Sequence, residues 1–257
     1  MTRSHPVRTS GRFFLNARPF ALLLSIFLLA VSSGCATAQA PDPLERVNRK
    51  VFAFNDGLDR VVLKPTARAY TAVVPAPIRG GVSNFFANSQ DLWSAANLVL
   101  QGQGIEGSRE AARFCTNSVV GMAGIFDVAT SLGLDRHGET FGSTLTAWGV
   151  APGAYIVWPL LGPSTARDSV GIPIDLLANP LSWIGYVPLR NGLSVARFVD
   201  QRAKALPLTK IIDEVALDKY LYVRDAYLQR HRRTRDDGRA SKSNDDGPDA
   251  DPAPPDR

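Results

Sequence analysis

Residues 141–166 constrain the fold of this chain more than any other segment, because 26 consecutive residues carry no charge. A single helix of that length could cross a lipid bilayer. Proline removes a backbone donor and glycine loosens the backbone, so one continuous helix is excluded. An interrupted backbone survives at membrane depth only where it packs in protein or faces water. The alternative is a buried glycine-rich loop of a soluble enzyme. The interrupting residues are Gly149, Pro152, Gly153, Pro159, Gly162 and Pro163.

The wider sequence favours contact with lipid. Residues 65–189 contain six arginines, no lysine and eight acidic residues, which is about half the charge density of the whole chain. A surface that faces only water usually carries more charge. All four tryptophans (Trp93, Trp148, Trp158 and Trp183) lie in this window, and tryptophan favours the interface between headgroups and hydrocarbon. We therefore expect a domain embedded in one membrane leaflet without a membrane-spanning helix.

The first 34 residues are typical of an export signal. Four arginines and no acidic residue accompany the apolar run 20–31, which is too short for a comfortable membrane anchor. Gly34-Cys35 follows directly and resembles a bacterial lipobox, although Ser32 stands where leucine is usual. We expect residues 1–34 to be a lipoprotein signal peptide and Cys35 to carry the lipid anchor.

The residues after the cysteine indicate where the protein goes. Ala36 directly after Cys35 resembles lipoproteins that are sorted to the outer membrane, and residues 35–41 are expected to form a tether. The expected location is the periplasmic-leaflet side of the outer membrane. The alternative is ordinary cleavage after Ala38, which would leave a free periplasmic protein.

Charge and cysteine content exclude other classes. Without residues 1–34 the chain has 25 basic and 24 acidic residues, so its high pI gives no support to nucleic-acid binding. Acylation of Cys35 leaves Cys115 without a disulfide partner, and we interpret Cys115 as a small buried apolar residue. The three histidines are scattered, so we expect neither a metal site nor a cofactor.

Residues 42–231 are expected to form one mainly α-helical domain, because alternating strand patterns are scarce. Asp42-Pro43 is typical of a helix start, and apolar residues from 44 to 61 form a stripe that could pack on a core or lie against headgroups. Lys64-Pro65 is expected to end this helix. Residues 232–257 contain hardly an apolar side chain and are expected to be disordered. Further helices are expected at 78–100 with a restart at 88 or 89, 105–119 with Glu110 and Arg113 on its polar side, 126–133, 164–178, 192–205 and 213–231.

The evidence for catalysis is weak. Residues 162–166 partly resemble the nucleophile elbow of lipases, but a proline precedes Ser164 and an alanine replaces the second glycine. The histidines lie in no recognisable triad context, so we interpret Ser164 as the cap of helix 164–178. Asp168 and Asp175 could share a helix face as paired carboxylates, although solvated or capping roles are more common. The sequence indicates a protein that is not an enzyme, with a lipid hydrolase using Ser164 as an alternative.

Several short motifs are spread over residues 42–231. They are Asp42-Pro-Leu-Glu-Arg-Val-Asn-Arg49, Phe52-Ala-Phe-Asn55, Val82-Ser-Asn-Phe85, residues 117–127, Phe141-Gly-Ser-Thr-Leu145, Trp148-Gly-Val150, Pro159-Leu-Leu-Gly-Pro-Ser-Thr-Ala-Arg-Asp168 and Tyr222-Val-Arg-Asp-Ala-Tyr227. Any one of them would be a weak signal, but together they are specific. The chain resembles the MlaA (VacJ) family of outer-membrane lipoproteins.

This resemblance implies a ring of helices in the inner leaflet of the outer membrane around a polar channel. Proteins of this family associate with trimeric porins, remove mislocalised phospholipids from the outer leaflet and pass them to the periplasmic carrier MlaC. The resemblance implies that residues 149–159 form a hairpin beside the channel. The implied channel and hairpin residues are Gly149, Gly153, Tyr155, Trp158 and Pro159, and the implied N-terminal motif residues are Asn48, Phe52 and Asn55.

Tyr155 is expected to face water or headgroups at the channel border, because a phenol offers an apolar ring and a polar tip. Leu98 is expected to lie on a packed face. A channel is physically sensible, since moving roughly 30 methylenes into water costs about 24 kcal/mol. Moving a charged headgroup through hydrocarbon is also costly. Apart from the hydrolase, the alternative is a structural lipoprotein that braces a porin.

Overall fold

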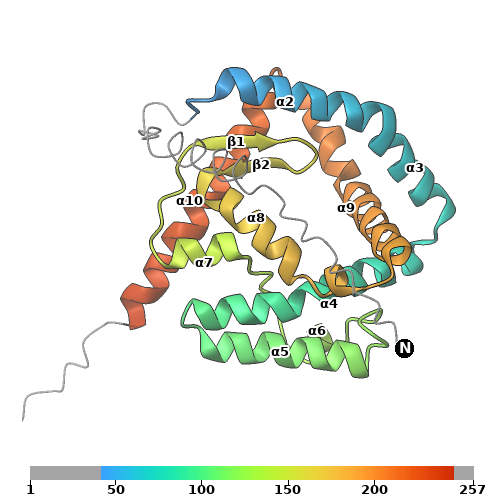
Figure 1. The fold of residues 1–257 in the computed structure, drawn as a ribbon, viewed down its shortest axis with the longest axis vertical. Helices are drawn as coiled ribbons and strands as arrows, with labels where there is room; N and C mark the ends of the chain where they lie inside the picture. Colours follow the sequence, from blue (N-terminus) through green and yellow to red (C-terminus); the bar gives the residue numbers. More distant parts are fainter. Residues whose placement is uncertain (1–41, 246–257) are drawn as a thin grey trace, which may run out of the picture.

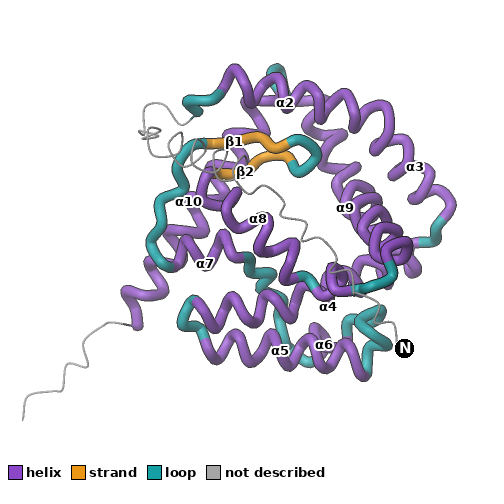
Figure 2. Tube along the Cα trace, in the orientation of Figure 1, coloured by secondary structure: helices purple, strands orange, loops and turns teal. Residues whose placement is uncertain are grey.

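The fold is mainly α-helical with one β-hairpin, in agreement with the fold class that the sequence predicts (Figures 1 and 2). The computed structural model describes residues 42–245, so Cys35, the signal peptide, the tether and residues 246–257 lie outside the described residues. The helices are α2 (Glu45–Leu58), α3 (Lys64–Val73), α4 (Ala76–Leu100), α5 (Gly104–Val119), α6 (Val128–Ser131), α7 (Phe141–Ala147), α8 (Ala166–Ala178), α9 (Val187–Val215) and α10 (Lys219–Asp245). The strands are β1 (Tyr155–Trp158) and β2 (Gly162–Thr165).

The elements are arranged as a ring (Figure 1). Helices α2 and α3 form one arc, α9 packs beside α3, and α4 and α5 pack against each other at the opposite side. The hairpin lies beneath α2, with its turn directed toward α9 (Figure 2). Between residues 42 and 245, none of the helices has both the length and the apolar character needed to cross a membrane.

Three helix boundaries differ from the sequence prediction. Lys64-Pro65 does not end the first helix, because a π-helical turn at Asp59–Leu63 joins α2 to α3 directly before Pro65. The wider turn takes up the proline without breaking the helical path. Helix α4 runs through Asn88 without a restart, and α9 runs through Pro207 to Val215, whereas this helix was expected to end at residue 205. Local breaker residues therefore mark fewer helix ends than the sequence suggests.

Helix α10 also continues further than expected. The sequence predicts that the folded domain ends at residue 231, whereas the helical backbone reaches Asp245. Arginine, alanine and lysine are good helix formers, so a helix that is already anchored by its first turns continues into this polar stretch. The expectation that residues 232–257 are disordered stays a prediction.

The distribution of polar and apolar side chains is opposite to that of a soluble protein. Sixteen polar or charged residues are buried in the described part of the chain, against only nine hydrophobic ones. By contrast, 34 large hydrophobic side chains are exposed. The stripe on α2 and the following π turn is largely exposed, with Val47, Phe54 and Val61 all more than half exposed, while Val51 packs against the cluster around Tyr155. An apolar surface of this extent marks a site of contact with membrane or protein.

A polar network replaces a hydrophobic core between α4, α5 and α6. The Arg113 guanidinium is 1% exposed and forms ion pairs with Asp91 at 3.2 Å and with Asp127 at 2.7 Å. Burial raises the pKa of Asp91 despite its ion pairs with Arg113 and Arg136. For Asp127, hydrogen bonds from Thr130, Arg113 and Asn117 outweigh the opposing effect of burial and lower its pKa to about 2. The polar side of helix 105–119 therefore points into the protein.

The opposite side of α5 faces outward, and Cys115 lies on it. Cys115 is exposed, so its interpretation as a buried apolar residue is wrong. Ile105 and Val119, at the two ends of the same helix, are also mostly exposed. The error has one cause, which is that an amphipathic pattern identifies two faces without stating which of them is buried.

Candidate functional site

The hairpin of β1 and β2 is the element on which the other parts of the site converge. Its strands pair antiparallel, with Tyr155 opposite Thr165 and Trp158 opposite Gly162. Gly149 and Gly153 in the preceding loop have φ angles of +85° and +68°, in the region that favours glycine. At Gly153 a Cβ would also come within 3.0 Å of Ala166, whereas Gly149 has open space around it.

Asn48 of α2 binds the backbone of β1 like a neighbouring strand. Its amide nitrogen donates to the carbonyl of Tyr155 at 2.9 Å, and its amide oxygen accepts from the N–H of Val157 at 2.9 Å. The same nitrogen donates to the carboxylate of Asp42 at 2.9 Å. Asn48 is almost completely buried, so these bonds are shielded from water. Asp42 therefore holds Asn48 in place and is not the helix cap that the sequence suggested.

Asn55 repeats this arrangement seven residues later, two helical turns along the same face of α2. Its nitrogen donates to the carbonyl of Trp158 at 2.9 Å, and its oxygen accepts from the N–H of Leu160 at 2.9 Å. Phe52 lies between the two asparagines and packs against Tyr220. The three residues of the N-terminal motif thus form one support for the hairpin.

Helix α10 supports the hairpin from another side. The ring of Tyr155 lies 6.4 Å from that of Tyr220 and 5.9 Å from that of Tyr227, measured between centroids. Tyr220 also donates a hydrogen bond to Asp42. Tyr220 and Tyr227 are seven residues apart, which places them on the same face of a helix. This spacing of two aromatic residues is the sequence signal for the support, and it was not among the predictions.

The expectation that Tyr155 faces water is wrong. Its side chain is 1% exposed, which is the same value as for Leu98, the residue expected to be packed. Burial raises the pKa of Tyr155 to about 12, and its hydroxyl has no hydrogen-bond partner among the described residues. The reason is that the side of β1 that carries Tyr155 and Val157 faces α10 and α2.

The exposed part of the hairpin is its turn. Pro159 is exposed, and Leu160 and Leu161 are each 54% exposed. Trp158 is half-buried at the end of β1, and its indole N–H donates to Ser169 at 2.7 Å. The turn therefore presents apolar side chains, while the strands are fixed by α2, α8 and α10.

Ser164 lies in β2 and does not form a catalytic triad. It is buried, and its hydroxyl lies 3.2 Å from both the Thr165 carbonyl and the Ser169 hydroxyl. The cap of α8 is Thr165, whose hydroxyl accepts from the Asp168 N–H at 3.1 Å, so the capping role of Ser164 is wrong by one residue. Within residues 42–245, no histidine ring nitrogen is hydrogen-bonded to Ser164.

The two carboxylates considered for catalysis have separate structural roles. A carboxylate oxygen of Asp168 lies 3.1 Å from the Nε2 atom of His231, and this contact ties α8 to α10. Hydrogen bonds from His231 and Arg167 lower the pKa of Asp168 although burial opposes this. Asp175 instead accepts hydrogen bonds from the Trp93 indole at 2.7 Å and from a backbone N–H of α7. In the part of the chain that the structure describes, no group of three or more potential metal ligands is found.

Fold and site together define a class: a ring of helices with an apolar outer surface, a polar interior and a hairpin fixed by asparagine and tyrosine side chains. The sequence matches the family described as MlaA lipoprotein over residues 40–234. The chain therefore belongs to the MlaA lipoprotein family.

Individual relatives agree with this assignment. The intermembrane phospholipid transport system lipoprotein MlaA of Escherichia coli (strain K12) is 36% identical over 223 residues, covering 84% of this chain and 88% of that protein. The protein of the same name from Haemophilus influenzae is 32% identical over 240 residues, covering 89% and 94%. A solved structure that concerns the maintenance of bacterial outer membrane lipid asymmetry superposes with a TM-score of 0.66 and 36% identity, covering 76% of this chain and 98% of that one.

Proposed function

We propose that this protein removes mislocalised phospholipids from the outer leaflet of the outer membrane through a polar channel and passes them to a periplasmic carrier. This activity would maintain the lipid asymmetry of that membrane. The observation that carries the proposal is the reversed polarity of the fold, with apolar side chains outside and charged groups such as Arg113 and Asp91 inside. A protein with such an apolar surface is stable where hydrocarbon or another protein covers it.

The energetics of lipid movement explain why such a shape is useful. Taking a whole phospholipid into water exposes roughly 30 methylenes, which costs about 24 kcal/mol. Taking its charged headgroup through hydrocarbon is also costly. A polar passage lets the headgroup cross while the acyl chains remain in lipid, so no covalent chemistry is needed. This agrees with relatives that are named as transport-system lipoproteins.

The proposed location is the periplasmic side of the outer membrane, with the ring embedded in the inner leaflet and Cys35 as the lipid anchor. The exposed apolar side chains of α4 and α5 would contact acyl chains or the outer wall of a trimeric porin. A soluble carrier of the MlaC type would receive the lipid on the periplasmic side. The relatives named for intermembrane phospholipid transport support these proposals.

The function is tested in a strain that lacks the protein. Expression of the wild type should lower the amount of phosphatidylethanolamine that a membrane-impermeant amine reagent labels in the outer leaflet. A porin-bracing protein would leave this labelling unchanged while altering porin stability. A hydrolase would generate lysophospholipid, and Ser164→Ala would abolish its effect. Purification from native membranes followed by mass spectrometry should recover phospholipid and a porin with the protein.

The anchor is tested separately with Cys35→Ser. We expect this variant to keep its signal segment or to be found outside the outer membrane, because the acylated thiol is lost. The measurement is membrane fractionation together with the mass of the N-terminal peptide. Wild-type protein that is free in the periplasm and begins at Gln39 would contradict lipidation.

A further inference from the structure

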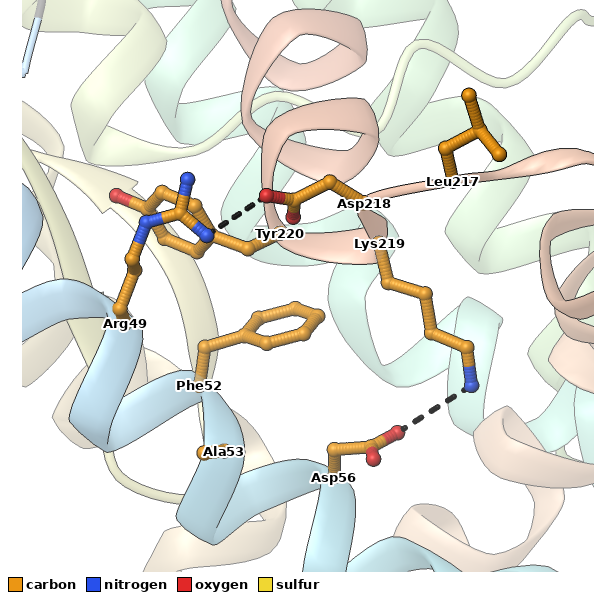
Figure 3. Close-up of a pocket in the computed structure, with 8 residues that line it drawn as sticks. All are labelled: Arg49, Phe52, Ala53, Asp56, Leu217, Asp218, Lys219 and Tyr220. Atoms are coloured by element: carbon orange, nitrogen blue, oxygen red, sulfur yellow. Dashed lines mark hydrogen bonds and ion pairs between the residues drawn. The ribbon is translucent and has the colours of Figure 1, made fainter.

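A pocket lies where α2 passes the junction between α9 and α10 (Figure 3). Its volume is about 430 Å³, which is within the range of roughly 300–1,000 Å³ that is usual for small-molecule sites. Two segments line it, one on α2 and one at the start of α10. The lining residues are Arg49, Phe52, Ala53, Asp56, Leu217, Asp218, Lys219 and Tyr220.

Two cations and two carboxylates face one another across this pocket. The Arg49 guanidinium bonds to Asp218 at 2.8 Å, and the Lys219 ammonium lies 3.9 Å from Asp56 (Figure 3). All four side chains are about one third exposed, and ion pairs of this kind contribute little and rearrange readily. The four charges sum to zero and each already has a partner, since Glu45 also pairs with Arg49, Asp213 with Lys219 and Arg60 with Asp56. A ligand that carries both a negative and a positive group can exchange with these partners without leaving a net charge in the pocket.

Both cations keep capacity for a further acceptor. Arg49 uses its Nε atom for Glu45 and its Nη1 atom for Asp218, while Nη2 has no hydrogen-bond partner among the described residues. In Figure 3 this second terminal nitrogen points away from Asp218. The Lys219 ammonium has three donors, of which one is directed to Asp213 at 2.6 Å. A phosphate oxygen is the acceptor that such donors bind most strongly.

Two aromatic rings form the floor of the pocket. The Arg49 guanidinium lies over the ring of Tyr220, 4.6 Å from its centroid, and this contact holds the cation in place. Phe52 packs edge-on against the same ring at 5.7 Å. Leu217 is fully exposed at the rim and offers an apolar surface to the part of a ligand outside the pocket. This combination suits a polar headgroup that is attached to an apolar body.

We propose that this pocket binds the headgroup of a zwitterionic phospholipid, with the phosphodiester on Arg49 and Lys219 and the ammonium on Asp56 and Asp218. The proposal rests on the function proposed above and adds a place where the headgroup is held. Since Tyr220 also contacts Tyr155 of β1, a headgroup bound here lies directly beside the side chains that fix the hairpin.

Binding is measured with purified full-length protein in detergent by isothermal titration calorimetry. The soluble probes are glycerophosphoethanolamine, which carries both charges, and inorganic phosphate, which carries only the negative one. We expect glycerophosphoethanolamine to bind and phosphate to bind at least roughly tenfold more weakly, because phosphate lacks the ammonium group that would contact Asp56 and Asp218. Equal binding of the two probes would identify a free-phosphate site and overturn the headgroup assignment.

Matched variants locate the binding. Arg49→Gln and Lys219→Gln should each weaken glycerophosphoethanolamine binding roughly tenfold, the loss expected for one charge-assisted hydrogen bond. The controls Arg109→Gln and Lys210→Gln remove cations that are more exposed and lie outside the pocket, and they should bind like the wild type. Equal weakening by pocket and control variants would mean a general charge effect and would overturn the proposal.

A steric variant keeps every charge in place. Ala53 is exposed and lines the pocket, so Ala53→Trp should fill the cavity and abolish binding without removing an ion pair. Ala112→Trp on the exposed side of α5 is the matched control. Circular dichroism and thermal unfolding show whether each variant keeps its fold. A folded Ala53→Trp variant that binds glycerophosphoethanolamine like the wild type would refute the pocket.

The outer-leaflet labelling assay separates this proposal from the proposed function. If the wild type clears outer-leaflet phospholipid and the folded Ala53→Trp variant clears it equally well, the pocket is not used in transport while the function stands. If the wild type clears nothing, the proposed function fails whatever the calorimetry shows. If Ala53→Trp loses lipid clearance and glycerophosphoethanolamine binding while Ala112→Trp keeps both, the result supports the proposed function and the headgroup pocket together.

Discussion

Replacing Asn48 by alanine should loosen the hairpin far more than the same replacement at Asn55. Asn48→Ala leaves the Tyr155 carbonyl and the Val157 N–H without partners in a buried site. Each unsatisfied buried group costs about 1–3 kcal/mol, so the loss of unfolding free energy should be about 2–6 kcal/mol. At Asn55 the partners lie near the exposed turn, where water can replace the side chain, and the loss should be about 1 kcal/mol.

The two effects can be read at separate amides. Hydrogen exchange followed by mass spectrometry on the detergent-solubilised protein should show that Val157 loses protection only in Asn48→Ala. Leu160 should lose protection in Asn55→Ala. Asn84→Ala, which removes one exposed 3.2 Å hydrogen bond to the backbone at Ile125, is a suitable control and should change neither amide.

Two outcomes would contradict the view that the side chain of Asn48 holds β1. If Val157 keeps its protection in a folded Asn48→Ala variant, the amide of Asn48 does not hold β1. If urea unfolding gives equal losses for the variants at positions 48 and 55, burial does not set the energy of these hydrogen bonds. The phospholipid labelling assay then shows whether a loosened hairpin changes lipid clearance in cells.

Three further predictions follow from the same geometry. Gly149→Val and Gly153→Val should both impair lipid clearance because both glycines have positive φ, and Gly153→Val should also lower the melting temperature more because its Cβ meets Ala166. Tyr155→Phe removes a hydroxyl without a partner and should leave the melting temperature unchanged or higher, whereas Tyr220→Phe breaks a hydrogen bond and should cost about 1 kcal/mol on urea unfolding. The folded-state pKa of Asp127 is about 2, below its ordinary value, so its contribution to stability should be full above about pH 4 and lost as the pH falls toward 2. Unfolding of the wild type and Asp127→Asn across this pH window measures that loss.

The sequence predicted the helical class and most helix positions, because their signals are local. The hairpin at residues 149–159 was implied by the resemblance, and the paired strands lie at Tyr155–Trp158 and Gly162–Thr165. Glycines and prolines mark residues 149–163 as an irregular segment, and apolar spacing marks α5. The residues Asn48, Phe52 and Asn55 came from resemblance alone. Nothing in their local pattern shows that two asparagines on a helix bind the backbone of a strand more than 100 residues away.

Tyr155 shows a different limit. An aromatic residue with a polar tip in an uncharged segment suits a channel wall and a buried cluster equally well by composition. The difference is made by Tyr220 and Tyr227, which belong to a helix some 70 residues later and pack against it. Only a pairing of β1 with α10 decides between these environments, and the hydrophobic pattern of β1 contains no information on that pairing.

Which face of each helix is buried is harder to predict from the sequence. The density of charged residues answers this question better than the periodicity of apolar residues does. Helix α5 shows the same amphipathic pattern whether its apolar side faces a core or a membrane. A core-facing interpretation would leave Arg113 and Glu110 in water, yet both are buried. A chain with so few charges can shield them inside only if its surroundings accept apolar side chains, as hydrocarbon does. The buried pair of Arg113 and Asp91 and the exposed apolar side chains are therefore two parts of one arrangement, in which the charges pair inside and the apolar groups remain at the surface.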